Sequence, residues 1–195
     1  MKRNLISAIL MTVVTTILLG VVYPLVVTGL AQVMFPGKAN GQLMTRDGKL
    51  IGSRIIAQPF TGAGYFHPRG SAAGNGYDAA NSGGTNLGPT NQKLLDRVKQ
   101  DVAAAQSENP AQPVPADYVT TSASGLDPEI TPASAQFQAP RVARERGIRE
   151  EQLLVLVQQH TEGRQFQFLG EPRVNVLELN LDLDSKFPLQ KRASR

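Results

Sequence analysis

The longest apolar run of the chain lies at its N-terminus and predicts a membrane-spanning helix. Residues 5–34 carry no charged side chain and are mostly aliphatic. About 20 apolar residues in a helix are enough to cross the hydrocarbon core of a bilayer. We therefore expect a short tail and a single transmembrane anchor over residues 1–34. The alternative is a signal peptide cleaved after Ala31, but the run exceeds the usual apolar region of a signal peptide.

Small residues recur at every fourth position of this run and predict a packing face for another membrane helix. They are Ala8, Thr12, Thr16 and Gly20. Helices associate in lipid through close van der Waals contact, which small side chains permit. The alternative is that these residues are simply common in membrane helices. Pro24 continues the spacing and is expected to kink or end the helix.

Basic residues flank both ends of the apolar run, so their number alone does not orient it. Lys2 and Arg3 precede the run, and Lys38, Arg46 and Lys49 follow it. A very short basic N-terminus before an apolar segment is typical of an export signal, and long domains translocate largely regardless of their charge. We expect the N-terminus inside the cell and the domain that follows outside.

Residues 35–195 are expected to form one extramembrane domain of mixed α and β structure, an α+β fold. Branched and alternating apolar residues predict strands over 50–58, 165–169 and 174–183, and the last two are joined by a turn into a hairpin. Residues 38–47 are interpreted as a short polar connection.

Helical periodicity alternates with these predicted strands. It predicts helices over residues 91–105, 132–146 and 150–160, with Thr90 or Asn91 and Thr131 as caps and Gly147 as a terminator. Asp127-Pro128 is a second helix-start signal, because an aspartate precedes a proline that suits the first helical position.

The composition excludes several classes of protein. The 195 residues contain no cysteine and two histidines, and the net charge is +4. Without cysteine there is no disulfide scaffold, thiol nucleophile or Cys-ligated zinc. The small and dispersed positive charge does not indicate nucleic-acid binding.

A glycine-rich and asparagine-rich segment, residues 61–91, is the most unusual part of the domain. Aromatic residues interrupt its glycines, which favours a folded loop over a solvated linker. Ser82, Gly83, Gly84, Thr85 and Asn86 precede a predicted helix, where backbone N–H groups can bind phosphate. The P-loop pattern is missing, so a structural loop is favoured over nucleotide binding.

Charged and titratable residues elsewhere allow only weak chemical hypotheses. His67 with Arg69, or with a carboxylate such as Asp78, could act in acid–base catalysis, but a lone histidine is more often a hydrogen-bonded loop residue. His160 is interpreted as a cation at a helix C-terminus.

Two runs of charge are interpreted as surface features. An acidic row on the last predicted strand could bind a cation, although the solvated face of an amphipathic strand is favoured; its members are Glu178, Asn180, Asp182 and Asp184. Four arginines alternate with glutamates and predict a charged helix face or partner surface; they are Arg141, Arg144, Arg146 and Arg149.

An ordered set of motifs gives the chain a family resemblance. The motifs are YFHPRGSA at residues 65–72, YDAANSGGTNLGPTN at 77–91, VPAD at 114–117, SASGLDP at 122–128 and GEPRVNVLELN at 170–180. Together with the N-terminal anchor they resemble the C subunits of bacterial Kdp potassium-transporting ATPases, over essentially the whole chain.

The resemblance implies a noncatalytic accessory subunit of a potassium import pump in the bacterial inner membrane. Its implied partners are a pore-forming subunit, a P-type ATP-hydrolysing subunit, a small single-helix subunit and the lipid bilayer. No cofactor is expected to bind stably, and contact with ATP is expected only through the hydrolysing subunit.

Two roles follow from the resemblance. A catalytic chaperone that raises the ATP affinity of the hydrolysing subunit needs a cytoplasmic domain, whereas the expected topology places the domain in the periplasm and favours stabilising or gating the outer mouth of the pore. Candidate partner contacts are Tyr65, His67, Arg69, Tyr77, Asp78, Asn81 and Asn86. A different class of function is an exported single-domain enzyme or binding protein, anchored or cleaved.

Overall fold

The computed structural model describes residues 1–189 and divides the chain into two compact units, Met1–Ser53 and Arg54–Arg195. Residues 190–195, the end of the predicted domain 35–195, lie outside the described residues. Helices and small sheets occur together, and this confirms the predicted mixed α and β class.

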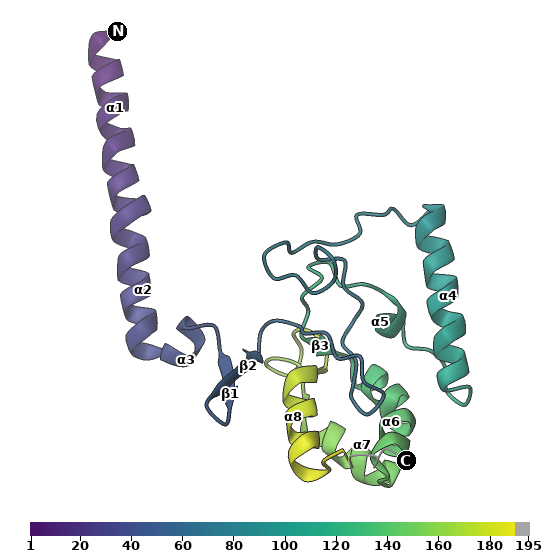
Figure 1. The fold of residues 1–195 in the computed structure, drawn as a ribbon. Helices are drawn as coiled ribbons and strands as arrows, with labels where there is room; N and C mark the ends of the chain where they lie inside the picture. Colours follow the sequence, from purple (N-terminus) through teal and green to yellow (C-terminus); the bar gives the residue numbers. More distant parts are fainter. Residues whose placement is uncertain (190–195) are drawn as a thin grey trace. The chain divides into compact units, whose positions relative to one another are not determined.

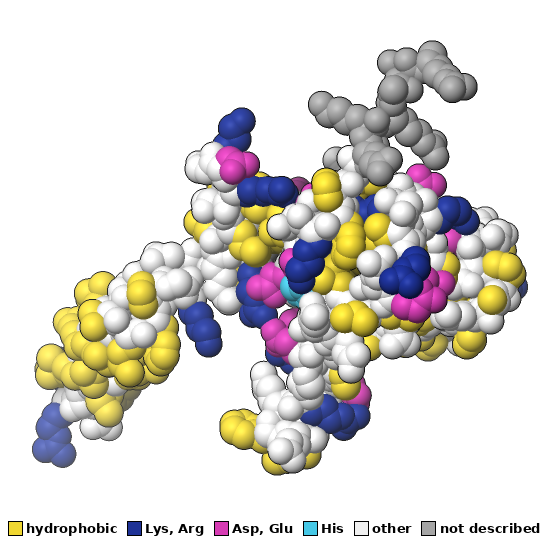
Figure 2. Space-filling view, turned by 90° about the horizontal axis from the view of Figure 1, so that it is seen from below, with side chains coloured by type: hydrophobic (Ala, Val, Ile, Leu, Met, Phe, Trp, Pro, Cys, Tyr) yellow, Lys and Arg dark blue, Asp and Glu magenta, His cyan; other side chains and the backbone are white. Residues whose placement is uncertain are grey.

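The first unit begins with one long apolar helix. It comprises α1 (Lys2–Ile17), a π-helical turn η1 (Leu18–Val22) and α2 (Tyr23–Met34), which follow one another without a break (Figure 1). Lys2–Met34 is long and apolar enough to cross a membrane, and its most apolar window is not buried inside the structure. Hydrophobic side chains cover the face of it that is seen in Figure 2. These properties support a single-pass membrane anchor.

A short helix and a hairpin complete the first unit. They are α3 (Pro36–Ala39), β1 (Leu43–Arg46) and β2 (Lys49–Ser53), and the two strands pair antiparallel. Asp47 and Gly48 have φ of 52° and 74°, the left-handed pair that a two-residue hairpin turn needs. The strand predicted over 50–58 is therefore wrong beyond Ser53. The predicted polar connection over 38–47 contains the strand β1, and the Asp47-Gly48 pair is the sequence signal for this hairpin.

The second unit contains five helices and three short strands among its described residues. The helices are α4 (Gln92–Glu108), α5 (Ala116–Val119), α6 (Pro132–Arg146), α7 (Glu150–Gln159) and α8 (Val176–Lys186). The strands are β3 (Glu129–Ile130), β4 (Thr161–Glu162) and β5 (Arg173–Asn175), and β5 lies between the other two in an antiparallel sheet.

Three of the helices begin where the capping and periodicity signals predict. Asn91 caps α4 by accepting a hydrogen bond from Lys93 N at 2.9 Å, and Thr131 caps α6 by accepting from Ser134 N at 3.0 Å. Gly147 ends α6 in the left-handed conformation, φ 67°. The third, α7, begins at Glu150 as expected.

Three predictions in the C-terminal half are wrong. Residues 165–169 do not form a strand but a turn closed by an isolated bridge between Gln165 and Leu169. Asp127-Pro128 does not start a helix, because Glu129 and Ile130 pair with β5. The strand predicted over 174–183 is β5 for only two residues and then becomes α8, so the predicted hairpin does not form. Asn175 is the physical reason, since its side chain accepts from Glu178 N at 3.1 Å and starts a helix.

The core of the second unit forms where α6, α7 and α8 meet the small sheet. Its fully buried members are Phe66, Ala135, Ala139, Val142, Leu153, Val174, Leu179 and Leu183. In Figure 1 these three helices lie together, whereas α4 stands to one side. Phe66 is the only one of these eight that comes from the glycine-rich segment, and it draws that segment into the core.

Candidate functional site

The small-residue stripe of the anchor runs into the π-helical turn, because Ala8, Thr12 and Thr16 precede that turn and Gly20 lies inside it. Four residues of an α-helix overshoot one turn by about 40°, so a spacing of four drifts around the helix. A π turn holds more residues than an α turn. The wider turn at Leu18–Val22 is therefore expected to offset part of this drift at Gly20.

Pro24 explains why the π turn lies there. Proline has no N–H, and its ring clashes with the carbonyl four residues earlier, which belongs to Gly20. Widening the turn relieves that clash, and the helix continues to Met34 instead of ending at Pro24. Ala31, the alternative cleavage position, lies inside α2.

Hydrogen bonds hold the start of the glycine-rich segment in a compact loop. The Ser71 hydroxyl donates to Gly125 O at 2.6 Å and accepts from Tyr77 N at 2.7 Å. The Tyr77 hydroxyl donates to Arg69 O at 2.9 Å. The guanidinium of Arg69 contacts Asp127 at 3.1 Å. The segment is folded as expected.

The predicted phosphate loop packs against residues 122–125. Gly83 N donates to Ser124 O at 2.9 Å, and the Ser82 hydroxyl donates to the same carbonyl at 2.9 Å. A Cβ on Gly84 would lie 2.8 Å from Ala123 O. These glycines therefore permit the two backbones to approach closely, and the Gly83 N–H is used inside the fold. The structural loop expected for residues 82–86, and phosphate binding as its less favoured alternative, both stay untested.

Two buried amide side chains form hydrogen bonds with the backbone of Phe66 and His67, as a neighbouring strand would do in a sheet. Asn180 of α8 accepts from Phe66 N and donates to Phe66 O, both at 2.9 Å. Gln138 of α6 accepts from His67 N at 2.8 Å and donates to His67 O at 3.1 Å. This segment is thus clamped from both sides by helices.

Two arginines of α6 continue the same clamp. Arg141 donates to Ala63 O and Tyr65 O at 2.6 and 2.9 Å and pairs with Glu108 at 2.7 Å. Arg146 donates to Gly64 O at 2.7 Å and pairs with Asp184 at 2.8 Å. Both arginines are buried. The predicted charged helix face or partner surface therefore does not include these two, whereas Arg144 and Arg149 are exposed.

His67 and Asp78 take part in different local contacts. His67 Nε2 lies 3.1 Å from Gly62 O, and burial, together with Arg141, lowers the pKa of His67. Asp78 accepts from Ala80 N at 2.9 Å and from the Asn81 amide at 2.6 Å. These bonds make His67 and Asp78 loop-stabilising residues, as the simpler interpretation expects.

The predicted acidic strand face is wrong because its residues lie on helix α8. Glu178 pairs with Arg54 at 2.7 Å, and Asp184 pairs with Arg146. Asp182 lies 2.9 Å from His160 and 2.8 Å from Lys186. Burial alone would raise the pKa of Asp182, but the hydrogen bonds with Lys186 and His160 outweigh burial and lower this pKa. Asn180 is buried, as described above.

Ion pairs on the small sheet are a feature that the sequence does not indicate. Arg173 of β5 contacts Glu129 of β3 at 2.9 Å and Glu162 of β4 at 2.7 Å. Arg54 also contacts Glu162. The residues come from distant parts of the chain, and the strand pairing brings Arg173 together with Glu129 and Glu162.

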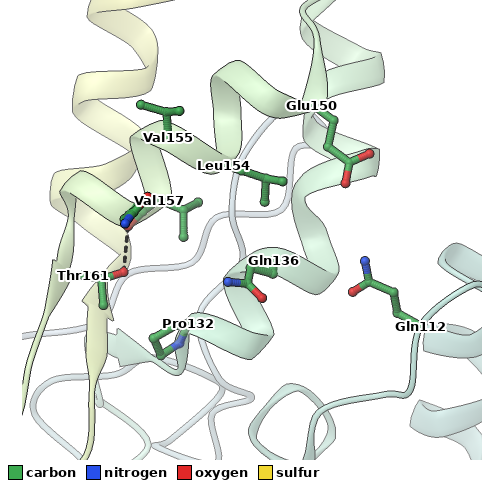
Figure 3. Close-up of a pocket in the computed structure, with 9 residues that line it drawn as sticks. Gln112, Pro132, Gln136, Glu150, Leu154, Val155, Val157 and Thr161 are labelled. Atoms are coloured by element: carbon green, nitrogen blue, oxygen red, sulfur yellow. Dashed lines mark hydrogen bonds between the residues drawn. The ribbon is translucent and has the colours of Figure 1, made fainter.

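A groove in the second unit lies between α6 and α7 (Figure 3). It measures about 580 Å³ and mixes glutamine and aliphatic side chains, such as Gln136 and Leu154. Thr161 beside it donates to Val157 O at 2.8 Å. Glu150 is the one charged side chain among the described residues of its lining, and these residues include no paired acid and base.

Within residues 1–189, no group of three or more His, Cys, Asp or Glu side chains is placed to hold a metal ion. Of the seven candidate partner contacts, Asn81 and Asn86 are exposed, whereas Tyr65, His67, Arg69, Tyr77 and Asp78 are half-buried. The seven stay a prediction as a partner surface.

Comparison with known proteins covers both units. The family model KdpC, K⁺-transporting ATPase, c chain, matches residues 5–185. The chain is 71% identical to the potassium-transporting ATPase KdpC subunit of Koribacter versatilis over 97% of this chain and 98% of that one. The KdpC subunits of Rhodospirillum rubrum and Acidobacterium capsulatum are 56% and 55% identical, over 97% and 93% of this chain and 99% and 98% of theirs.

Proposed function

The chain belongs to the KdpC family, and on this premise we propose that it is a noncatalytic, membrane-anchored subunit of a potassium-transporting ATPase. The observation that carries this proposal is the helix Lys2–Met34, whose apolar surface is not covered within the chain. The internal contacts of His67, Arg141 and Arg146 also support it, because these groups hold the fold together.

The partners in this proposal are the other subunits of the ATPase. A pore-forming subunit, a P-type ATP-hydrolysing subunit and a small single-helix subunit would supply the pore and the hydrolysis. The small-residue face of the anchor supports contact with their membrane helices. No cofactor is proposed for this chain, and ATP would contact it only through the hydrolysing subunit.

The proposed location is the bacterial inner membrane, with the N-terminus in the cytoplasm and the second unit in the periplasm. The short basic N-terminus supports this orientation. In this position the domain would stabilise or gate the outer mouth of the pore. A catalytic chaperone of ATP binding would instead need the domain in the cytoplasm.

A single cysteine tests the orientation. The chain contains no cysteine, so Ser107→Cys gives one unambiguous labelling site at an exposed position of α4. In intact cells, a membrane-impermeant maleimide should label this variant. Labelling only after the membrane is opened would overturn the periplasmic placement and favour the chaperone role.

Growth tests the transport function itself. A strain without this chain should fail to grow when potassium is limiting and should recover with added potassium or with the chain supplied in trans. Normal growth of the deletion strain at limiting potassium would refute the proposed function.

A further inference from the structure

The two most exposed large apolar side chains described in the second unit lie together in one loop. The 163–171 loop lies between β4 and β5 and is exposed throughout. Phe166, Phe168 and Leu169 are 81%, 70% and 48% exposed. Folded proteins rarely leave large apolar side chains together in water, and such patches mark interaction sites.

The backbone holds these side chains in a fixed arrangement. Phe166 and Gln167 have φ of 50° and 70°, which non-glycine residues adopt only at some cost. Gln165 N donates to Leu169 O, and Leu169 N donates to Gln165 O, both at 2.9 Å. A rigid loop loses less conformational entropy when it binds.

The charges around the loop favour a protein partner over a lipid surface. Arg164 donates to both carboxylate oxygens of Glu171, at 2.8 and 2.7 Å, and Arg173 pairs with Glu129 and Glu162. Loops that bind anionic membranes present unpaired cations, whereas these arginines are already neutralised. An apolar centre within a polar rim is the anatomy of a protein interface.

The area of the patch indicates what kind of protein partner fits. Two phenylalanines and a leucine at these exposures offer roughly 400 Å². A stable complex between two free proteins buries about 800 Å² on each side, so the loop is too small to hold a freely diffusing partner or a second copy. It suffices for a partner that the anchor already holds nearby, because tethering raises the effective concentration.

We propose that the 163–171 loop docks into an apolar pocket on another subunit of the potassium-transporting ATPase, with Phe166 and Phe168 as its anchoring side chains. This inference rests on the proposed function. The docked loop is a second contact outside the bilayer, separate from the helix Lys2–Met34.

Co-purification of the full chain with its partner subunits tests the docking. The test variant is Phe166→Asn/Phe168→Ser, in which asparagine still accepts the left-handed backbone. We expect about a tenfold loss of partner subunits retained by the tagged chain. The control is Val155→Ser, which removes an apolar side chain that is 55% exposed on α7 and should leave retention unchanged.

Unchanged retention by the double variant overturns the inference. It leaves the proposed function intact, because that function is tested separately by the retention of partner subunits on the wild-type chain. If the wild-type chain retains no subunit, the proposed function and the inference both fail. Equal loss in the Val155→Ser control also overturns the inference, since the effect would then not be specific to the loop.

A photo-crosslinker identifies the occupant directly and keeps an aromatic group in place. In the co-expressed complex, the full chain carrying Phe168→p-benzoylphenylalanine should crosslink to another subunit of the ATPase. Crosslinks to lipid, or to a second copy of this chain, would overturn the inference.

Discussion

Asn180 is the side chain on which the position of the glycine-rich segment most directly depends. It is buried and satisfies both the N–H and the C=O of Phe66 at 2.9 Å. Asn180→Leu keeps the volume but leaves both backbone groups buried without partners, at a cost of about 2–4 kcal/mol in the free energy of unfolding. Chemical unfolding of the full chain in detergent micelles measures this loss.

Asn81→Leu is the matched control, because Asn81 is exposed and its side chain bonds only to Asp78 among the described contacts. It should change the free energy of unfolding by no more than about 0.5 kcal/mol. Equal effects of the two substitutions would contradict the structural role given to Asn180.

His67 should make the stability of the chain depend on pH. Burial, and then Arg141, lower its pKa below the ordinary 6.5, although Gly62 O and Glu108 oppose this. Below pH 6.5 the unfolded chain therefore binds a proton that the folded chain resists. The stability that His67 contributes is complete above pH 6.5 and is lost as pH falls through its lowered pKa.

His67→Gln removes this titration and keeps a side chain that can donate to Gly62 O. The stability of wild type relative to this variant should therefore fall between pH 7.5 and pH 5, as measured by unfolding of the full chain at each pH. A difference between the two proteins that does not change with pH would contradict the prediction. Other titrating groups are common to both proteins and cancel.

At the scale of the elements, the bounds of α6 could be predicted from the sequence, whereas α8 could not be told from a strand. Thr131 starts α6 and Gly147 ends it through local hydrogen bonding and backbone conformation, which do not depend on the rest of the fold. In α8, leucines at 177, 179, 181 and 183 alternate as in a strand, while Val176, Leu179 and Leu183 also fit one helix face. The two patterns conflict, and packing against α7 and β5 decides for the helix.

Helix α4 packs far less closely than α6, and this predicts a difference in local stability. Ala105 is its one buried residue, whereas nine residues of α6 are buried. Leu95 and Val102 of its apolar stripe are 40% and 36% exposed. Helices owe most of their stability to tertiary packing, so the amides of residues 96–103 should exchange on the order of 100-fold faster than those of α6.

Hydrogen–deuterium exchange of the isolated full chain measures this difference, and α6 serves as the internal reference. Equal protection of α4 and α6 would show that the apolar stripe of α4 is covered in solution and would contradict the prediction.

At the scale of the whole molecule, sequence motifs indicate the family, while the candidate contact surfaces need coordinates. The motif at residues 65–72 is held by the clamp formed by Gln138, Asn180 and the two buried arginines, and no spacing rule pairs residues that lie 71 or 114 positions apart. The 163–171 loop reads as an ordinary alternating strand, because its exposure depends on the turn at Phe166 and Gln167.

The last prediction concerns how the anchor holds the chain in its complex. Replacing Thr12, Thr16 and Gly20 by leucine fills the small-residue face. Hydrogen bonds of polar side chains such as threonine between membrane helices contribute about 1–2 kcal/mol each, so retention of partner subunits should fall about tenfold. Leucine at Ser7, Val14 and Val21, on the opposite face, adds bulk without touching the stripe and should leave retention unchanged. If both triple variants assemble like wild type, the stripe faces lipid.

If the anchor and the 163–171 loop act as two linked contacts, combining their variants should abolish the complex, because neither contact then raises the effective concentration for the other.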